Sequence, residues 1–228
     1  PYVPLLDIII FRLFGKKIIV DFDDAVFENY TGGIIKKSLR RKFFHTVKYA
    51  KLVTVGSDYL FERMIEFKAS LIYFLPTTYT ETISDNNRDN QIIVGWIGTP
   101  KTSAYLKPLH GVLKKLETEC NVRLIAIGAS RDDWPFEIVD WTEESEKPEL
   151  SKFDIGIMPL PDEAFERGKC AYKLIQYMSV GIPFVASGVG ENVKLAAYGG
   201  GLLAENEEEW YKYLKELLTS IELRMRLG

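Results

Sequence analysis

Short apolar runs alternate with amphipathic stretches along the first third of the chain. IIVDF (18–22), KLVTVG (51–56) and LIYFLP (71–76) are typical of strands, because each is a brief run rich in β-branched or aromatic residues. Residues 34–50 instead place their apolar side chains at helical spacing. Ser57 is a good N-cap for a second helix that follows it. The pattern therefore predicts strands connected by helices.

The same alternation restarts after a polar stretch at residues 77–91, which shows no periodicity and is typical of a linker. Beyond it the sequence predicts helices near 103–118, 169–180 and 207–219 and strands at IIVGWIG, VRLIAIG, EIVDW, FDIGIMPL, PFVAS and GGLLA. Strands that are apolar on both faces and alternate with helices indicate a parallel sheet covered on both sides. We expect an α/β protein in three parts: a partial N-terminal Rossmann-like domain (1–80), a linker (81–91) and a complete, doubly wound C-terminal Rossmann-like domain (92–228).

Ligands of open parallel sheets bind at the carboxyl ends of the strands. Three predicted strand ends carry turn-forming or charged residues, and these are Gly98-Thr99-Pro100, Pro159-Leu160-Pro161 and the DFDD of residues 21–24. The candidate chemistry is expected at these ends.

The most informative stretch is PLPDEAFERGKCAYKLIQYMSVGIPFVAS, residues 159–187. A helix that begins near Gly168 would bury one apolar face, made of Ala171, Leu174, Ile175 and Met178. Its other face would carry Lys169, Lys173 and Gln176. Two cations at a helix N-terminus form an anion site suited to a diphosphate, and the glutamine could hydrogen-bond sugar hydroxyls. The alternative is a solvated polar face without a ligand.

This stretch resembles the donor-binding motif of glycosyltransferase family 4, which comprises retaining enzymes of GT-B architecture. QYMSVGIPFVAS follows the family's Ala-Met, two small residues and Gly-x-Pro-Val-Val-Ala-Ser, and the similarity extends to VGWIGTP, DWTEE, GVGEN and ELRMRLG. The two motif glutamates are replaced by Gly168 and Gln176. With Lys169 and Lys173 this resembles an RGKC-x-x-K-x-x-Q-Y variant of bacterial surface-polysaccharide enzymes. The family's first strands and final crossing helix are expected to lie outside this chain.

The resemblance implies transfer of a sugar from a nucleotide-diphosphate sugar to a saccharide or lipid-linked acceptor, with retention and with neither metal nor cofactor. The second domain would hold the donor. The implied donor contacts are the turn with Gly98, Thr99 and Ser103, the helix with Gly168 and Lys169, Gln176 for the ribose, the backbone from Val139 to Trp141 for the base, and Asn192 in the GVGEN loop.

Three carboxylates, Asp21, Asp23 and Asp24, lie at the end of the first predicted strand. In the resemblance, Asp23 stands where many members carry a histidine that contacts the donor, so we expect Asp23, Lys169 and Lys173 to be catalytic. A metal-binding Asp-x-Asp is one alternative. A haloacid-dehalogenase-like phosphatase that uses Asp21 and Asp23 is another. Such an enzyme also needs a lysine and an acid later in the chain, and the loop 131–133 offers only an approximate match to that pair. Asp24 as an N-cap is the third.

The net charge of −3 hides an asymmetry, because seven basic residues and no acidic residue lie between Asn29 and Ser57. Residues 34–50 could dock on an anionic membrane surface that presents a lipid-linked acceptor. A solvated face is the alternative. Nucleic acid is not expected as a partner, because no recognition motif accompanies the charge.

Two cysteines, Cys120 and Cys170, exclude a disulfide framework and suit a reducing cytosol. The longest apolar run is interrupted by charges and is too short to span a bilayer. We therefore expect a cytoplasmic location, with peripheral attachment at the inner face of the membrane. A non-catalytic interaction module remains the alternative from another functional class.

Overall fold

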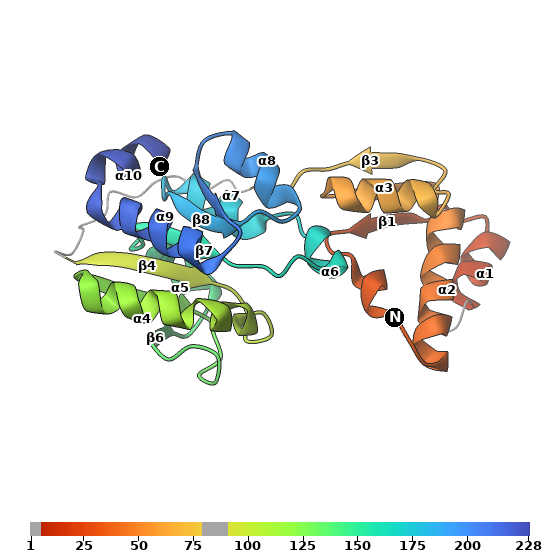
Figure 1. Cartoon of the computed structure of the whole chain (residues 1–228). Helices are drawn as coiled ribbons and strands as arrows, with labels where there is room; N and C mark the ends of the chain where they lie inside the picture. Colours follow the sequence, from red (N-terminus) through yellow and green to blue (C-terminus); the bar gives the residue numbers. More distant parts are fainter. Residues whose placement is uncertain (1–5, 79–90) are drawn as a thin grey trace. The chain divides into compact units, whose positions relative to one another are not determined.

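The computed structural model describes residues 6–78 and 91–228, which form two compact units (Figure 1). Unit 1 contains the chain up to Thr77 together with Asp162–Cys170, and unit 2 contains Thr78–Pro161 together with Ala171–Gly228. The predicted linker, 81–91, lies outside the described residues except for Gln91.

Unit 1 is built on a three-stranded parallel sheet in the order β1-β2-β3. Its core is aromatic and aliphatic, with Phe27, Val53 and Leu60 fully buried. Ser57 begins helix α3 as predicted, because its hydroxyl accepts a hydrogen bond of 3.3 Å from the amide of Leu60. The elements are α1 (Leu6–Leu13), β1 (Ile19–Phe22), the 3₁₀ helix η1 (Val26–Asn29), α2 (Ile34–Tyr49), β2 (Leu52–Val55), α3 (Asp58–Glu66), β3 (Ile72–Phe74) and α6 (Ala164–Arg167).

Unit 2 is a six-stranded, fully parallel sheet in the order β6-β5-β4-β7-β8-β9. Its strands are β4 (Ile92–Ile97), β5 (Val122–Ile127), β6 (Glu137–Val139), β7 (Ile155–Met158), β8 (Phe184–Ser187) and β9 (Gly201–Ala204). Its helices are η2 (Ser103–Leu109), α4 (His110–Glu119), α5 (Glu143–Leu150), α7 (Tyr172–Ser179), α8 (Glu191–Ala197), α9 (Glu207–Thr219) and α10 (Ile221–Leu227).

Both faces of this sheet are covered, as the apolar strands predicted. Alternate residues of β4 enter different cores: Val94 and Trp96 pack with α4 and α9, whereas Ile93 and Ile97 pack with α5 and α7. The strand order reverses between β4 and β7, since the chain first moves outward through β5 and β6 and then returns beside β4. Such a reversal opens a crevice at the carboxyl ends of the strands. The predicted α/β fold with parallel, Rossmann-like sheets is confirmed.

The segment Asp162–Cys170 leaves unit 2 after β7 and packs within unit 1. The hydroxyl of Ser57 donates a hydrogen bond of 3.0 Å to the carbonyl oxygen of Gly168. The α-carbon of Gly168 rests against Ala25, which is fully buried. The predicted C-terminal domain (92–228) includes these nine residues, whereas the structure groups them with unit 1.

The predicted helix from Gly168 onward is wrong in its first turn. The structure has two helices, α6 and α7, separated by four residues, and Ala171 before α7 has a φ of 55°. A residue in the left-handed region cannot continue an α-helix, so Lys169 lies outside α7. The apolar face that the sequence predicted is buried at Ala171 and Leu174.

We expect Gly168→Ala to destabilise the protein by about 1–3 kcal/mol, which is typical of overpacking. An added Cβ would collide with the Cβ of Ala25, whereas the φ of −80° at Gly168 suits alanine. Any loss would therefore report the contact and not backbone strain. Urea unfolding measures it. Gly188→Ala is the matched control, because its Cβ would enter open space. Equal stability of the two variants would show that the segment is not packed on Ala25.

Candidate functional site

A cavity of about 530 Å³ lies in unit 2, where β4, β5 and β6 end. Two helices of the same unit, α5 and α7, contribute the remaining walls. The cavity therefore occupies the edge of the sheet at which parallel α/β proteins bind ligands. Its lining residues are Ile97, Gly98, Thr99, Pro100, Gly128, Ala129, Asp140, Trp141, Glu146, Tyr172, Lys173 and Gln176.

Two glycines allow the loops after β4 and β5 to approach each other closely. The amide of Gly98 donates to the carbonyl oxygen of Ile127 at 3.0 Å, and the amide of Gly128 donates to that of Val139 at 2.9 Å. Gly128 has a φ of 73°, and a Cβ there would collide with the carbonyl oxygen of Gly98. A Cβ at Gly98 would collide with the ring of Trp96. Glycine at both positions thus permits the close packing of the two loops beneath the cavity.

Glu146 connects two walls of the cavity. Its Oε1 accepts a hydrogen bond of 2.8 Å from Nε2 of Gln176, and its Oε2 accepts one of 2.6 Å from Nε1 of Trp141. Glu146 is not among the predicted site residues, although the DWTEE run lies just before it. The carboxylate holds the amide of Gln176, which is only 2% exposed, in a fixed orientation.

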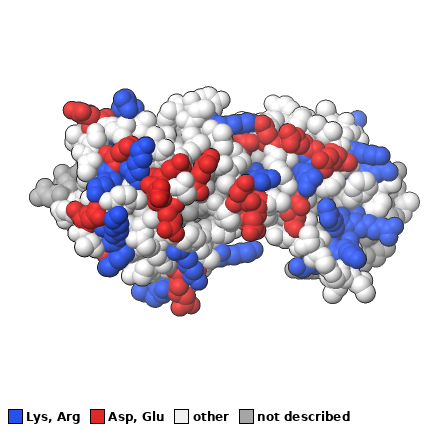
Figure 2. All heavy atoms as spheres, viewed as in Figure 1, with Lys and Arg blue, Asp and Glu red and all other residues white. Residues whose placement is uncertain are grey.

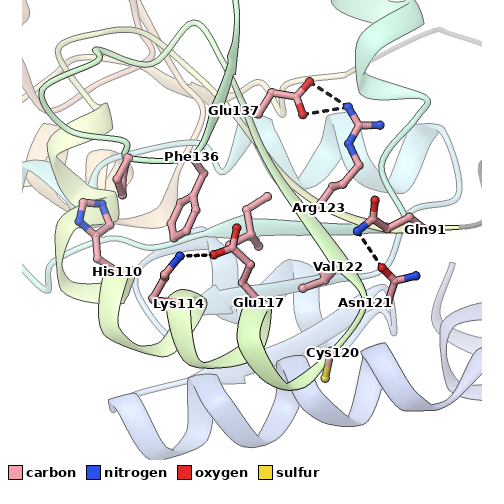
Figure 3. A pocket seen from close by; sticks show the side chains of 12 residues that line it. Gln91, His110, Lys114, Glu117, Cys120, Asn121, Val122, Arg123, Phe136 and Glu137 are labelled. Carbon is pink, nitrogen blue, oxygen red and sulfur yellow. Dashed lines mark hydrogen bonds and ion pairs between the residues drawn. The ribbon is translucent and has the colours of Figure 1, made fainter.

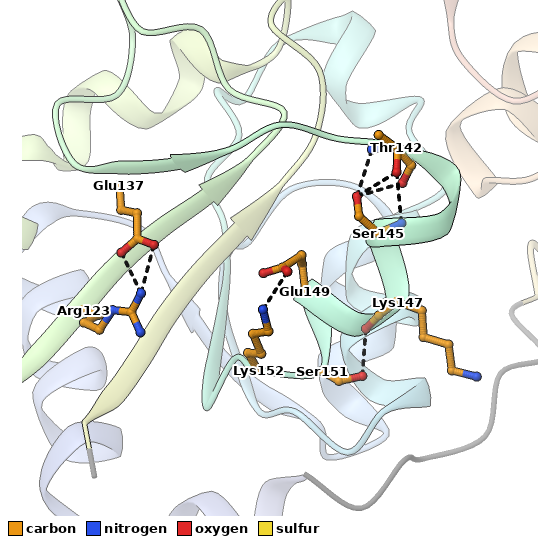
Figure 4. A network of polar contacts seen from close by, with 8 residues as sticks. All are labelled: Arg123, Glu137, Thr142, Ser145, Lys147, Glu149, Ser151 and Lys152. Carbon is orange, nitrogen blue, oxygen red and sulfur yellow. Dashed lines mark hydrogen bonds and ion pairs between the residues drawn. The ribbon is translucent and has the colours of Figure 1, made fainter. Parts of the chain in front are cut away.

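A capping box orients the helix that carries Glu146 (Figure 4). The amide of Ser145 donates to Oγ1 of Thr142 at 3.1 Å, and the amide of Thr142 donates to Oγ of Ser145 at 3.0 Å. Glu146 follows directly, in the first helical turn, where the helix dipole favours a negative charge.

Lys173 supplies a positive charge to the cavity from the first turn of α7. Its Nζ lies 5.5 Å from the ring centroid of Trp96, which is buried, so a cation–π contact helps to position the ammonium group. α7 has no side-chain cap and no acidic residue in its first turn. The cavity therefore combines a cation, uncapped helix amides and a Glu–Gln pair that can recognise hydroxyl groups.

Five of the predicted site residues line this cavity: Gly98, Thr99, Trp141, Lys173 and Gln176. Ser103 does not. It is fully buried, and its hydroxyl donates to the carbonyl oxygen of Pro100 (2.8 Å) and to Asp133 (2.7 Å). The family resemblance implied a donor contact for Ser103, whereas in the structure its hydroxyl holds the loop.

Two further predicted residues also lie away from the lining. Val139 contributes its backbone, whose carbonyl oxygen accepts the Gly128 hydrogen bond. Asn192 is buried after β8, and its Nδ2 donates to the carbonyl oxygen of Ser187 at 3.0 Å.

The predicted residues Asp23, Gly168 and Lys169 belong to unit 1. Nζ of Lys169 lies 3.5 Å from Oδ1 of Asp24 and 4.5 Å from the ring centroid of Phe165. Lys169 and Lys173, expected on one helix face, are thus in different units. Within unit 1 the lysine pairs with a carboxylate of the DFDD cluster.

The DFDD carboxylates have distinct surroundings. Asp21 accepts a hydrogen bond from the hydroxyl of Thr54 on the neighbouring strand. Asp24 does not cap η1, because the N-cap position is Ala25. Partial burial raises the pKa of the Asp23 carboxyl above its ordinary value, and the negative charges of Asp21 and Asp24 raise it further. Among residues 6–78 and 91–228, no three His, Cys, Asp or Glu side chains form a group that could hold a metal.

A second cavity of unit 2, of about 620 Å³, lies beside α4 and the starts of β4 and β5 (Figure 3). Its cations are already paired, since Lys114 contacts Glu117 at 2.6 Å and Arg123 contacts Glu137 at 2.8 Å. It also contains residues at the amino ends of the strands, away from the loops that bind ligands in this kind of sheet. The cavity with Lys173 is therefore the better candidate.

No protein-family model matches the sequence, and a comparison with curated proteins gives no match. Among solved structures, the chain is similar to sucrose-phosphate synthase from Thermosynechococcus elongatus (TM-score 0.73, 14% identity), over 99% of this chain and 65% of that one. It is also similar to HepE from Anabaena in complex with UDP and glucose (TM-score 0.73, 14% identity), over 98% of this chain and 68% of HepE. TarM gives a TM-score of 0.69 at 14% identity, over 93% of this chain and 45% of TarM.

These neighbours are glycosyltransferases of the GT-B fold, so the predicted GT-B type of this chain is confirmed. At such identities the similarity establishes the fold alone. The chain spans less than two thirds of the sucrose-phosphate synthase and less than half of TarM. In the described part of the chain, no helix is both long and apolar enough to cross a membrane.

We expect Asp23→Asn to stabilise the protein at pH 7 and to have no effect at pH 3. The pKa of Asp23 is raised in the folded state above the ordinary value of 3.8. The folded state therefore holds this proton more tightly than the unfolded chain, and the wild type loses stability as the pH rises from 3.8 through the folded pKa. Melting temperatures between pH 3 and pH 7 measure the difference.

Asp162→Asn is the control with the opposite sign. The hydrogen bond from Arg167 lowers the pKa of the Asp162 carboxyl, so this variant should be less stable than the wild type at neutral pH and equal to it at low pH. If Asp23→Asn also destabilised the protein at pH 7, Asp23 would be making favourable contacts as an anion.

Proposed function

We propose that this chain is the donor-binding part of a glycosyltransferase that moves a sugar from a nucleotide-diphosphate sugar to a saccharide acceptor. The observation that carries the proposal is the cavity at the carboxyl ends of β4–β6, which combines the cation of Lys173 with the Glu146–Gln176 pair. The GT-B fold supports it, and one structural neighbour, HepE, is in complex with UDP and glucose.

We assign the parts of the cavity to the parts of a nucleoside diphosphate by their chemistry. Lys173 and the uncapped backbone amides at the start of α7 bind the phosphates, since both are donors to anions. Gln176 and Glu146 bind ribose hydroxyls, because together they offer a donor and acceptors. Trp141, half exposed at the mouth of the cavity, contacts the base.

The chemical step would be promoted mainly by electrostatics. As the glycosidic C–O bond breaks, the diphosphate leaving group gains negative charge, so a donor aimed at it stabilises the transition state more than the ground state. We propose a retaining transfer without a metal. Catalytic contributions from Asp23 and Lys169, a lipid-linked acceptor in polysaccharide biosynthesis and a cytoplasmic location remain parts of this proposal.

The phosphatase alternative gains no support from the described contacts. Asp21, which would be the nucleophile, accepts a hydrogen bond from Thr54. In the loop 131–133, which would supply the later acid, Asp133 forms an ion pair of 2.7 Å with Lys107. These acids belong to different units.

Calorimetric titration of the chain with UDP, GDP and ADP tests the proposal. At least one should bind. For that nucleotide, we expect Lys173→Ala to weaken diphosphate binding by roughly 10- to 100-fold, the value of a charge-assisted hydrogen bond, and to leave binding of the free nucleoside unchanged. Gln176→Ala should weaken binding of both the nucleoside diphosphate and the free nucleoside, because we assign the Gln176 side chain to the ribose. In the full-length protein, Lys173→Ala should also lower turnover by on the order of 10²–10³.

Lys114→Ala is the matched control. It removes a lysine from the other cavity of the same unit and should leave every affinity unchanged. The proposal fails if no nucleoside diphosphate binds the wild type, or if Lys173→Ala and Lys114→Ala behave alike.

A further inference from the structure

The first two turns of α2 project from unit 1. Over residues 34–41, Leu39 alone is partly buried, and every other residue is exposed. The contacts that hold α2 on the sheet begin later, with Phe43 and Val47 in the core. The exposed turns therefore contribute little to the packing of unit 1.

The tip of this helix is apolar. Ile34 and Ile35 are 89% and 74% exposed. They follow Gly32 and Gly33, both with positive φ and with open space around them. Two adjacent isoleucines that the fold leaves in water are costly to expose and are suited to an apolar partner.

Cations surround the tip. Lys36, Lys37, Arg40 and Arg41 are exposed, and none of them forms an ion pair with another described residue. No acidic residue occurs between Asn29 and Ser57. Figure 2 shows Lys and Arg atoms gathered over α2. The combination of apolar tip and basic flank is typical of helices that bind the interface of a lipid bilayer.

Local signals do not stabilise the start of α2. Its N-cap is Gly33, which forms no side-chain cap, and its first turn holds two lysines and no acid. Cations at this end oppose the helix dipole. In contrast, α9 begins with Asn206 as a cap and three glutamates. An anionic surface would supply the negative charge that the first turn of α2 lacks.

We propose that the N-terminal turns of α2 dock unit 1 on an anionic lipid bilayer. Ile34 and Ile35 enter the boundary between headgroups and acyl chains, and the four cations contact the headgroups. A nucleic acid would engage the cations but would leave the isoleucines in water, so a bilayer is the better match. Each cation near such a surface strengthens partitioning about fivefold. This surface does not depend on the nucleotide cavity or on sugar transfer.

Sedimentation of the whole chain with vesicles tests the docking surface. We expect binding to vesicles of phosphatidylcholine with phosphatidylglycerol and none to phosphatidylcholine alone. Replacing Lys36, Lys37, Arg40 and Arg41 by Gln should weaken binding by about 10²–10³-fold. Ile34→Ser with Ile35→Ser should weaken it about tenfold or more. All six side chains are exposed, so folding should be unaffected, and circular dichroism checks this.

A matched control removes the same charge elsewhere, through Lys101→Gln, Arg131→Gln, Lys212→Gln and Arg226→Gln, and should keep binding within about fivefold of the wild type. Nucleotide affinity of the α2 variants, measured in parallel, should not change and separates this proposal from the donor site. The proposal is overturned if the wild type does not bind anionic vesicles, or if the isoleucine variant binds them as tightly as the wild type. It is also overturned if the control loses as much vesicle affinity as the variant that lacks the four α2 cations. Binding of duplex DNA or RNA in place of vesicles would also overturn it.

Discussion

The close approach of two backbone turns, at Gly98 and Gly128, is the constraint on which the candidate site depends. The loops after β4 and β5 stay hydrogen-bonded to each other and to β6 beyond the ends of the strands. That continuity fixes the floor of the cavity and brings Trp141 to its rim. A Cβ at Gly128 would collide with the carbonyl oxygen of Gly98 and separate the loops, and one at Gly98 would collide with the ring of Trp96. The backbone turns therefore form one side of the cavity, and α5 and α7 contribute its remaining walls.

The stretch after β7 distributes its charges between two units. Lys169 pairs with Asp24 in unit 1, while Lys173 lies over Trp96 in unit 2, and between them Ala171 adopts a left-handed conformation. A non-glycine residue with this conformation costs about 1–2 kcal/mol, so the surrounding packing must enforce it. Within unit 2, Ala171 is buried, and its carbonyl oxygen accepts hydrogen bonds from the amides of Leu174 (3.0 Å) and Ile175 (3.3 Å).

The sequence predicted the parallel sheets because apolar strands alternating with helices have few other ways to fold. Five cavity residues were also predicted: Gly98 and Thr99 from a turn at a strand end, Lys173 and Gln176 from the polar face of a helix, and Trp141 from the family resemblance. The start of α7 could not be predicted, since alanine carries no preference for positive φ. Glu146 was missed because its partner Gln176 lies 30 residues away in the chain. Ser103 was misplaced for a related reason: Asp133, also 30 residues away, draws its hydroxyl into the loop.

The N-termini of the helices differ in their side-chain caps and in the charges of their first turns. Side chains cap α3, α5, α9 and α10, through Ser57, Thr142, Asn206 and Ser220. Both α2 and α7 lack a capping side chain and an acid in the first turn, and both carry lysine there. A missing cap typically costs a helix about 1 kcal/mol, and an adjacent cation adds to that cost. An anion would relieve both penalties at once. Among the helices whose N-terminal caps the structure describes, α2 and α7 combine a missing cap with lysine in the first turn, and these are the ends for which we propose anionic ligands, a diphosphate at α7 and lipid headgroups at α2.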